Sequence, residues 1–93
     1  MLRLVLALTL FYSIAQAAIV PDVRAAIGKN DFAAAERLVA QYRAEKGVTP
    51  ELIEAQSWMG RGALAAKDLD RAESYAAETR RLALDVLKGR KLD

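Results

Sequence analysis

The chain has 93 residues, enough for one small domain. It contains neither cysteine nor histidine, which excludes a disulfide framework, a zinc site of thiolates and imidazoles, and a histidine-based catalytic triad. Its 14 basic and 12 acidic residues give a net charge of +2, which provides no electrostatic case for a nucleic-acid partner. Hydrophobic residues make up 54% of the chain, but 19 of them are alanines, so few large side chains are available for a core.

The first 17 residues have the layout of a secretory signal peptide. Arg3 precedes an apolar run over residues 4–14, and the Ala-Gln-Ala of residues 15–17 supplies the small residues of a cleavage site. A membrane-spanning helix needs about 20 apolar residues, roughly twice the length of this run. We therefore expect cleavage after Ala17, a periplasmic or secreted product, and membrane contact only transiently through the signal peptide.

The rest of the chain, residues 18–93, has helical spacing throughout, so the sequence predicts an all-α fold. Pro21 favours the first turn of a short helix that ends near Gly28, where we expect glycine to adopt a left-handed cap. A second helix begins at the Asn30-Asp31 cap and runs to about Lys46. Its predicted buried stripe contains Phe32, Ala35, Leu38, Val39 and Tyr42.

Thr49 and Pro50 give a third helix a clear start, with a hydroxyl at the N-cap and proline at the first helical position. This helix should run to about Ala66, with one face formed by Leu52, Ile53, Ala55, Gln56, Met59, Gly60 and Ala63. A fourth helix should start around residues 68–70 and end near Lys88. Its predicted stripe contains Ala72, Tyr75, Ala76, Thr79, Leu82, Ala83 and Val86. Five apolar residues near its end wrap most of this helix, so part of that cluster should stay exposed in a monomer; they are Leu82, Ala83, Leu84, Val86 and Leu87.

Two segments 37 residues apart resemble each other. Residues 31–43 (DFAAAERLVAQYR) and 68–80 (DLDRAESYAAETR) each open the second helix of a hairpin. The aspartate caps the helix, the next apolar residue packs back on the preceding helix, and an alanine allows close approach. The matching pairs are Asp31/Asp68, Phe32/Leu69, Ala35/Ala72, Glu36/Glu73, Ala40/Ala77 and Arg43/Arg80.

This pattern resembles the tetratricopeptide repeat, a helix-turn-helix unit of about 34 residues with small residues where its helices cross. Gly60, Ala63, Leu69 and Ala72 fit the family's small and apolar positions, and a longer loop over residues 47–49 would absorb the extra length. The resemblance implies about one and a half antiparallel hairpins, with residues 18–93 as an incomplete helical-repeat domain. A generic helical bundle is the alternative.

A second resemblance covers most of residues 18–93. The stretches DVRAAIGKNDFAAAERLVAQYR and GVTPELIEAQSWMGRGALAAKDLDRAESYAAETRRLAL, after a secretory signal, look like the helical N-terminal region of secreted bacterial thioredoxin-like proteins of the TlpA type. In that family the helical region precedes a thioredoxin fold with a Cys-x-x-Cys redox pair. Because this chain has no cysteine, the resemblance assigns redox activity to none of its residues.

No group of residues in the sequence has the spacing of a catalytic, metal-binding or phosphate-binding site. The acidic residues between 68 and 73 lack the twelve-residue spacing of an EF-hand, and the Gly-Arg-Gly of residues 60–62 follows no strand, unlike a phosphate-binding loop. We therefore predict no catalytic, cofactor-binding or metal-binding residue and no enzymatic activity of the chain itself.

Two functions remain as expectations. The first is a secreted or periplasmic protein-interaction or scaffold segment, with a protein or peptide partner or self-association and no nucleic acid. The tetratricopeptide-like register would place its partner-binding residues on the concave face of the third helix, at Glu54, Ser57, Arg61, Leu64 and Ala65. The alternative is a truncated N-terminal region of a thioredoxin-like disulfide oxidoreductase, which a Cys-x-x-Cys sequence encoded downstream of Asp93 would support.

Overall fold

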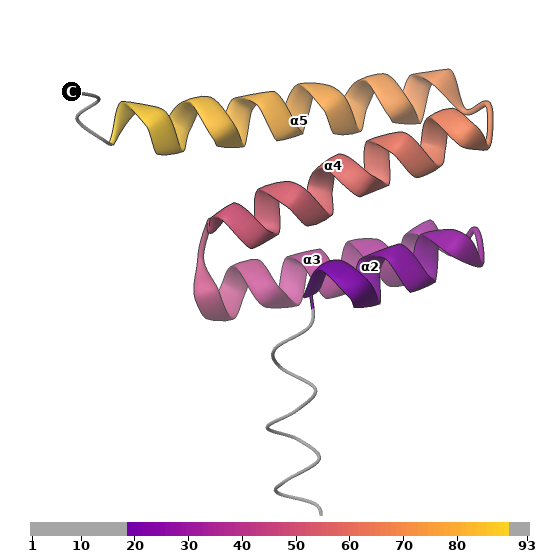
Figure 1. Ribbon diagram of the computed structural model, residues 1–93, viewed down its shortest axis with the longest axis horizontal. Helices are drawn as coiled ribbons and strands as arrows, with labels where there is room; N and C mark the ends of the chain where they lie inside the picture. Colours follow the sequence, from indigo (N-terminus) through magenta and orange to yellow (C-terminus); the bar gives the residue numbers. More distant parts are fainter. Residues whose placement is uncertain (1–18, 90–93) are drawn as a thin grey trace, which may run out of the picture.

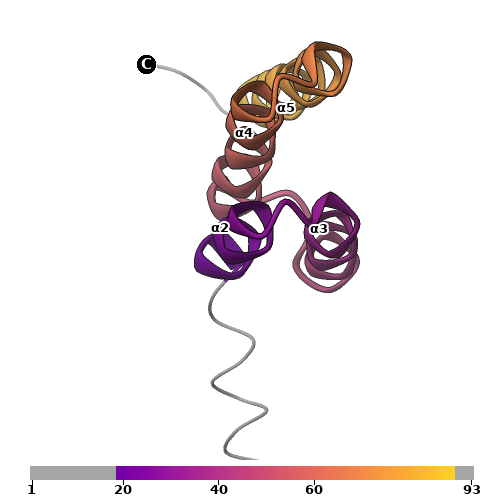
Figure 2. The same cartoon turned by 90° about the vertical axis from the view of Figure 1, so that its right-hand side faces the viewer.

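The computed structural model describes residues 19–89, which form four α-helices and, within that range, no β-strand. The helices are α2 (Ile19–Gly28), α3 (Phe32–Lys46), α4 (Pro50–Ala65) and α5 (Leu69–Lys88). Consecutive helices run antiparallel, and α4 lies between α5 and the α2–α3 pair (Figure 1). The end view places α2 directly against α4, with α3 beside α2 (Figure 2). The predicted all-α fold is confirmed, whereas the predicted signal peptide lies outside the described residues.

Helix starts coincide with the capping residues in the sequence. The side chains of Asp31, Thr49 and Asp68 each accept a hydrogen bond from the backbone amide three residues later, at 3.0, 3.2 and 3.2 Å. The Thr49 hydroxyl also shares a 2.8 Å hydrogen bond with the Tyr42 hydroxyl, which ties the end of α3 to the start of α4. Gly47 ends α3 with a φ of 78°, a conformation that suits glycine.

The left-handed residue after α2 is Asn30, with a φ of 58°, and not Gly28 as the sequence predicted. The helix continues through Gly28, and the reversal occurs two residues later, where asparagine tolerates the left-handed region better than most residues. Lys67 adopts the same conformation, with a φ of 63°, between α4 and α5.

The two turns have the same backbone hydrogen bonds at an offset of 37 residues. The amides of Asn30 and Lys67 each donate to the carbonyl three residues earlier, at 2.8 and 3.0 Å. The amides of Asp31 and Asp68 each donate to the carbonyl five residues earlier, at 2.9 and 3.0 Å. The short sequence repeat therefore corresponds to a repeated hairpin, with α2–α3 as the first copy and α4–α5 as the second.

The core lies where α2, α3 and α4 meet and extends to the first half of α5. Its buried members are Val23, Phe32, Ala35, Ala55, Met59, Ala63 and Tyr75. The predicted stripes of α3 and α4 face this core, with every member buried or half-buried. The predicted stripe of α5 is wrong at Ala76, which is exposed, because no described helix covers that side of α5.

The helices α2 and α4 approach closely at Gly62 of α4. A Cβ added there would lie 2.2 Å from Cγ2 of Ile27, so only glycine allows α2 and α4 to pack at this distance. Gly60 differs, because a Cβ there would lie 3.7 Å from the Tyr75 Cβ, an ordinary contact. The repeat pattern assigned Gly60 to a small position where helices cross, whereas the tight contact in the structure is at Gly62.

Candidate functional site

An open groove of about 700 Å³ runs between α4 and α5. Small residues form its floor, the exposed Leu64 and Leu69 stand at the end next to the turn, and charged side chains stand along its length. The groove is lined by Ser57, Gly60, Arg61, Leu64, Leu69, Ala72, Glu73, Ala76, Thr79, Arg80 and Ala83.

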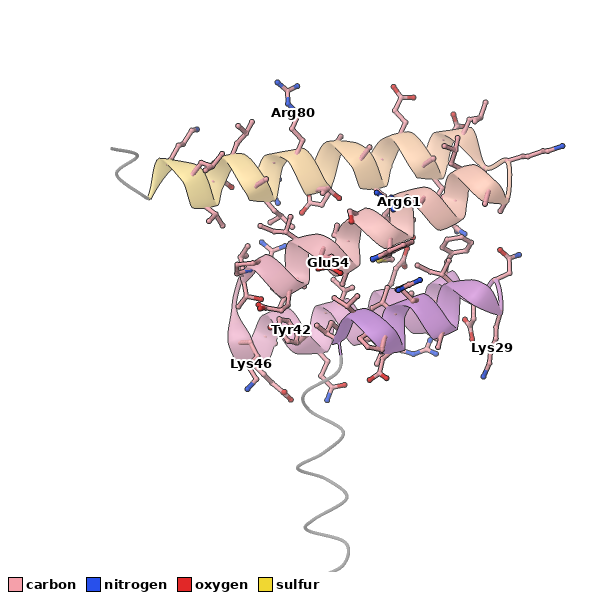
Figure 3. All side chains as sticks on the ribbon, in the orientation of Figure 1. Lys29, Tyr42, Lys46, Glu54, Arg61 and Arg80 are labelled. Atoms are coloured by element: carbon pink, nitrogen blue, oxygen red, sulfur yellow. The ribbon has the colours of Figure 1, made fainter. Side chains whose placement is uncertain are left out.

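Three of the five residues predicted to bind a partner, Ser57, Arg61 and Leu64, line this groove. The other two, Glu54 and Ala65, are exposed on α4 outside it. Figure 3 shows Arg61 projecting from α4 and Arg80 from α5. The tetratricopeptide-like register assigned the binding residues to the first helix of the hairpin alone, so the lining from α5 was not predicted. The 37-residue offset was the signal for it, because it relates the α5 positions to buried positions of α3.

Residues of the groove are much more exposed than the residues at the equivalent positions of the first hairpin. Phe32 of the first hairpin is 6% exposed, whereas its counterpart Leu69 is 65% exposed. Ile27 is half-buried, and its counterpart Leu64 is 60% exposed. The difference arises because the second hairpin covers these positions of the first, with Gly62 of α4 against Ile27 and Tyr75 of α5 on the Phe32 ring. No helix among residues 19–89 does the same for the second hairpin.

The polar side chains of the two hairpins differ in the same way, because those of the first hairpin contact the next hairpin and those of the second have no such contact among residues 19–89. The Tyr75 hydroxyl of α5 donates a hydrogen bond to the Glu36 carboxylate of α3, and Arg43 of α3 lies 3.6 Å from the Glu78 carboxylate of α5. These side chains link the second helix of one hairpin to the second helix of the next. The repeat counterparts of Glu36 and Arg43 are Glu73 and Arg80, whose side chains make no hydrogen bond or ion pair with another described residue.

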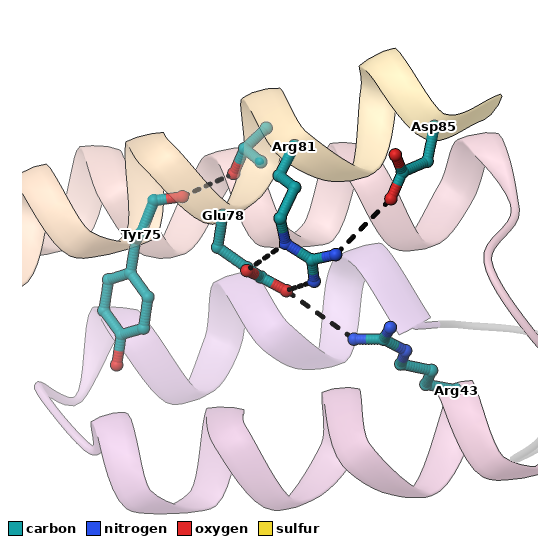
Figure 4. Close-up of polar contacts among 6 residues, drawn as sticks. Arg43, Tyr75, Glu78, Arg81 and Asp85 are labelled. Atoms are coloured by element: carbon teal, nitrogen blue, oxygen red, sulfur yellow. Dashed lines mark hydrogen bonds and ion pairs between the residues drawn. The ribbon is translucent and has the colours of Figure 1, made fainter. Parts of the chain in front are cut away.

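Glu78 is the centre of a charged network on α5 (Figure 4). Arg81 donates to it at 2.6 Å and also reaches Asp85 at 3.4 Å. The hydrogen bond from Arg81 lowers the pKa of Glu78, and the Arg43 charge acts in the same direction. The Arg43–Glu78 ion pair, like the Tyr75–Glu36 hydrogen bond, bridges α5 to α3 through long side chains, on the side away from the groove.

Tyr75 is a buried anchor between α3 and α5. Its ring stacks on Phe32 with centroids 6.3 Å apart. Burial, followed by the hydrogen bond to Glu36, raises the pKa of Tyr75 to about 12, because both favour the protonated phenol. The group is therefore neutral at physiological pH and serves packing rather than proton transfer.

Trp58 is half-buried between α2 and α4. The guanidinium carbons of Arg24 and Arg61 lie 4.1 and 4.7 Å from the centre of its ring, a cation–π arrangement. The ring thus contributes to packing of the first helices of the two hairpins. Arg61 both contacts this ring and lines the groove.

Within residues 19–89 no group of three or more metal-ligating side chains comes together, and no helix is long and apolar enough to cross a membrane. No model of a known protein family matches the chain, and no curated protein or solved structure shows significant similarity to it.

Proposed function

We propose that the chain is an exported, non-enzymatic helical-repeat interaction module, with tetratricopeptide-like hairpins, whose α4–α5 groove receives a helix from a protein or peptide. The observation that carries this proposal is the repeat itself. The α2–α3 hairpin has a helix, α4, packed on it, and the equivalent surface of the α4–α5 hairpin is an open groove.

The groove has the properties that a helix requires. Ala72, Ala76 and Ala83 present small side chains along α5, so a second helix axis can approach to about 8–10 Å. Leu64 and Leu69 offer apolar surface at one end. Leu64 is 60% and Leu69 65% exposed, so complete burial of each contributes about 1–2 kcal/mol, which makes the groove a favourable docking surface.

A peptide of residues 49–66 is the appropriate probe, because α4 is the helix that fills the equivalent place on the first hairpin. Titration of the purified protein with this peptide should shift the amide NMR signals of groove residues, including Gly60, Leu69 and Ala76. Ala76→Arg should weaken the binding by filling the groove. Ala77→Arg is the matched control, because Ala77 is the exposed neighbour of Ala76 and does not line the groove.

Equal binding by the two variants, or signal shifts confined to residues outside the groove, would contradict the proposal. Circular dichroism of both variants checks that α5 is intact, and since arginine is a good helix former neither substitution should reduce helicity.

A further inference from the structure

We propose that the natural occupant of the α4–α5 groove is α5 of a second copy of this chain, in a two-fold dimer with the two α5 helices antiparallel. This inference rests on the proposed function of the groove and names its partner. The orientation agrees with the repeat, because α4 runs antiparallel to α3 where it packs on the first hairpin.

The charges along α5 are self-complementary in this arrangement. Glu73 lies three residues before Ala76 and Arg80 lies four residues after it, and all three line the groove. When two α5 helices cross antiparallel near Ala76, Glu73 of each copy therefore lies opposite Arg80 of the other. The dimer thus contains two equivalent ion pairs, as a two-fold interface requires. Glu73 and Arg80 are the repeat counterparts of Glu36 and Arg43. In the first hairpin those two residues contact Tyr75 and Glu78 of the second hairpin.

The apolar positions are arranged in the same way. Leu69 lies at one end of the groove face, and Leu87, 18 residues or five helical turns later, lies on the same face at the other end. Leu69 is 65% exposed and Leu87 44% exposed. With Glu73 opposite Arg80, position 69 of one copy lies opposite position 84 of the other, so Leu69 comes within about one helical turn of Leu87, and Leu64 adds further apolar surface there. Alanines occupy the middle, where the helices are closest.

Two other occupants fit less well. In a head-to-tail arrangement, α2 and α3 of a second copy would pack on the α4–α5 hairpin as α4 and α5 pack on the first hairpin. The residues of α3 that would then face Glu73 and Arg80 are the repeat counterparts of Tyr75 and Glu78. These counterparts are Leu38 and Gln41. Neither of these carries a charge for Glu73 or Arg80. A partner segment of a single charge sign would leave either Glu73 or Arg80 facing a like charge.

Charge reversal tests the pairing directly. Sedimentation equilibrium of the purified protein should show a dimer. Glu73→Arg alone and Arg80→Glu alone should each raise the dimer dissociation constant by about tenfold, since each replaces two exposed ion pairs with two repulsive contacts. An equimolar mixture of the two variants should recover the wild-type affinity, because a heterodimer restores opposite charges at both contacts. The controls are Glu45→Arg and Arg37→Glu, which make the same charge changes at exposed positions of α3 and should leave the dissociation constant unchanged.

A monomer at all concentrations overturns the dimer, and binding of the 49–66 peptide to that monomer would still support the proposed function. A dimer whose affinity is unaffected by the reversals, or whose variants do not associate preferentially with each other, overturns the α5–α5 pairing. Failure of the peptide to bind a monomer overturns both proposals.

Discussion

Substitution of Gly62 by alanine tests the packing of the two hairpins against each other. The added Cβ would lie 2.2 Å from the Ile27 Cγ2, whereas carbon atoms pack best at about 3.5–4.0 Å. Ile27 is β-branched and lies in a helix, where one χ1 rotamer is strongly preferred, so its methyl group cannot rotate away without strain. Either this rotamer changes or α2 moves away from α4.

The expected cost follows from two opposing effects. Overpacking a well-packed contact costs about 1–3 kcal/mol. Replacing glycine by alanine within a helix stabilises by about 0.5–1 kcal/mol. Gly60→Ala is the matched control, because it gains the same helix propensity with no contact shorter than 3.7 Å. We therefore expect Gly62→Ala to be less stable than Gly60→Ala by about 1–3 kcal/mol.

Urea denaturation followed by circular dichroism measures this difference. The double variant Ile27→Ala/Gly62→Ala removes the clashing methyl group. In that background the Gly62→Ala change should no longer destabilise, which gives a favourable coupling energy in the double-mutant cycle. Equal stability of Gly60→Ala and Gly62→Ala, or no coupling between positions 27 and 62, would refute this account of the α2–α4 contact.

Three further predictions concern titration and processing. The pKa of Tyr75 is raised to about 12 from an ordinary value of 10.0, so the contribution of its phenol to stability is complete below about pH 10 and is lost as the pH rises towards 12. The melting temperature of Tyr75→Phe should therefore change less between about pH 10 and 12 than that of the wild type. Because the pKa of Glu78 is lowered, its contribution is present above the ordinary value of 4.5 and is lost as the pH falls through the lower folded value. Acid melts of Glu78→Gln should therefore be flatter than those of the wild type, and an equally steep acid transition would contradict this. Mass spectrometry of the exported protein should find Ala18 at its N-terminus, and retention of residues 1–17 on the exported product would contradict the signal peptide.

Local signals in the sequence were sufficient to predict the helices. Asp31, Thr49 and Asp68 are capping residues whose side chains determine where a helix begins, and the structure has all three bonds. The position of the left-handed residue was not predictable from glycine alone. The hydrogen bonds of the turn determine where the positive φ falls, and they place it at Asn30 rather than Gly28.

The candidate site was predictable only in part. An amphipathic pattern shows which face a helix can bury, but it does not show whether a neighbour is present to bury it. The pattern therefore assigned Ala76 to the buried stripe of α5, whereas the structure exposes it in the groove. The pairing of Arg43 with Glu78 depends on where two long side chains meet across separate helices, and no spacing in the sequence indicates this.

The identity of the two turns has a consequence for lengthening the chain. Because residues 30 and 67 share a conformation and a hydrogen-bond pattern, Lys67 can be followed by Asp31 as well as by Asp68. A duplicate of residues 31–67 inserted between Lys67 and Asp68 would therefore have native-like junctions at both ends. The additional copy of α4 would lie over the hairpin that precedes it, and the open groove would move to the new end. The 37-residue segment is thus a module from which longer helical arrays can be built, with nearest-neighbour contacts that repeat at each step.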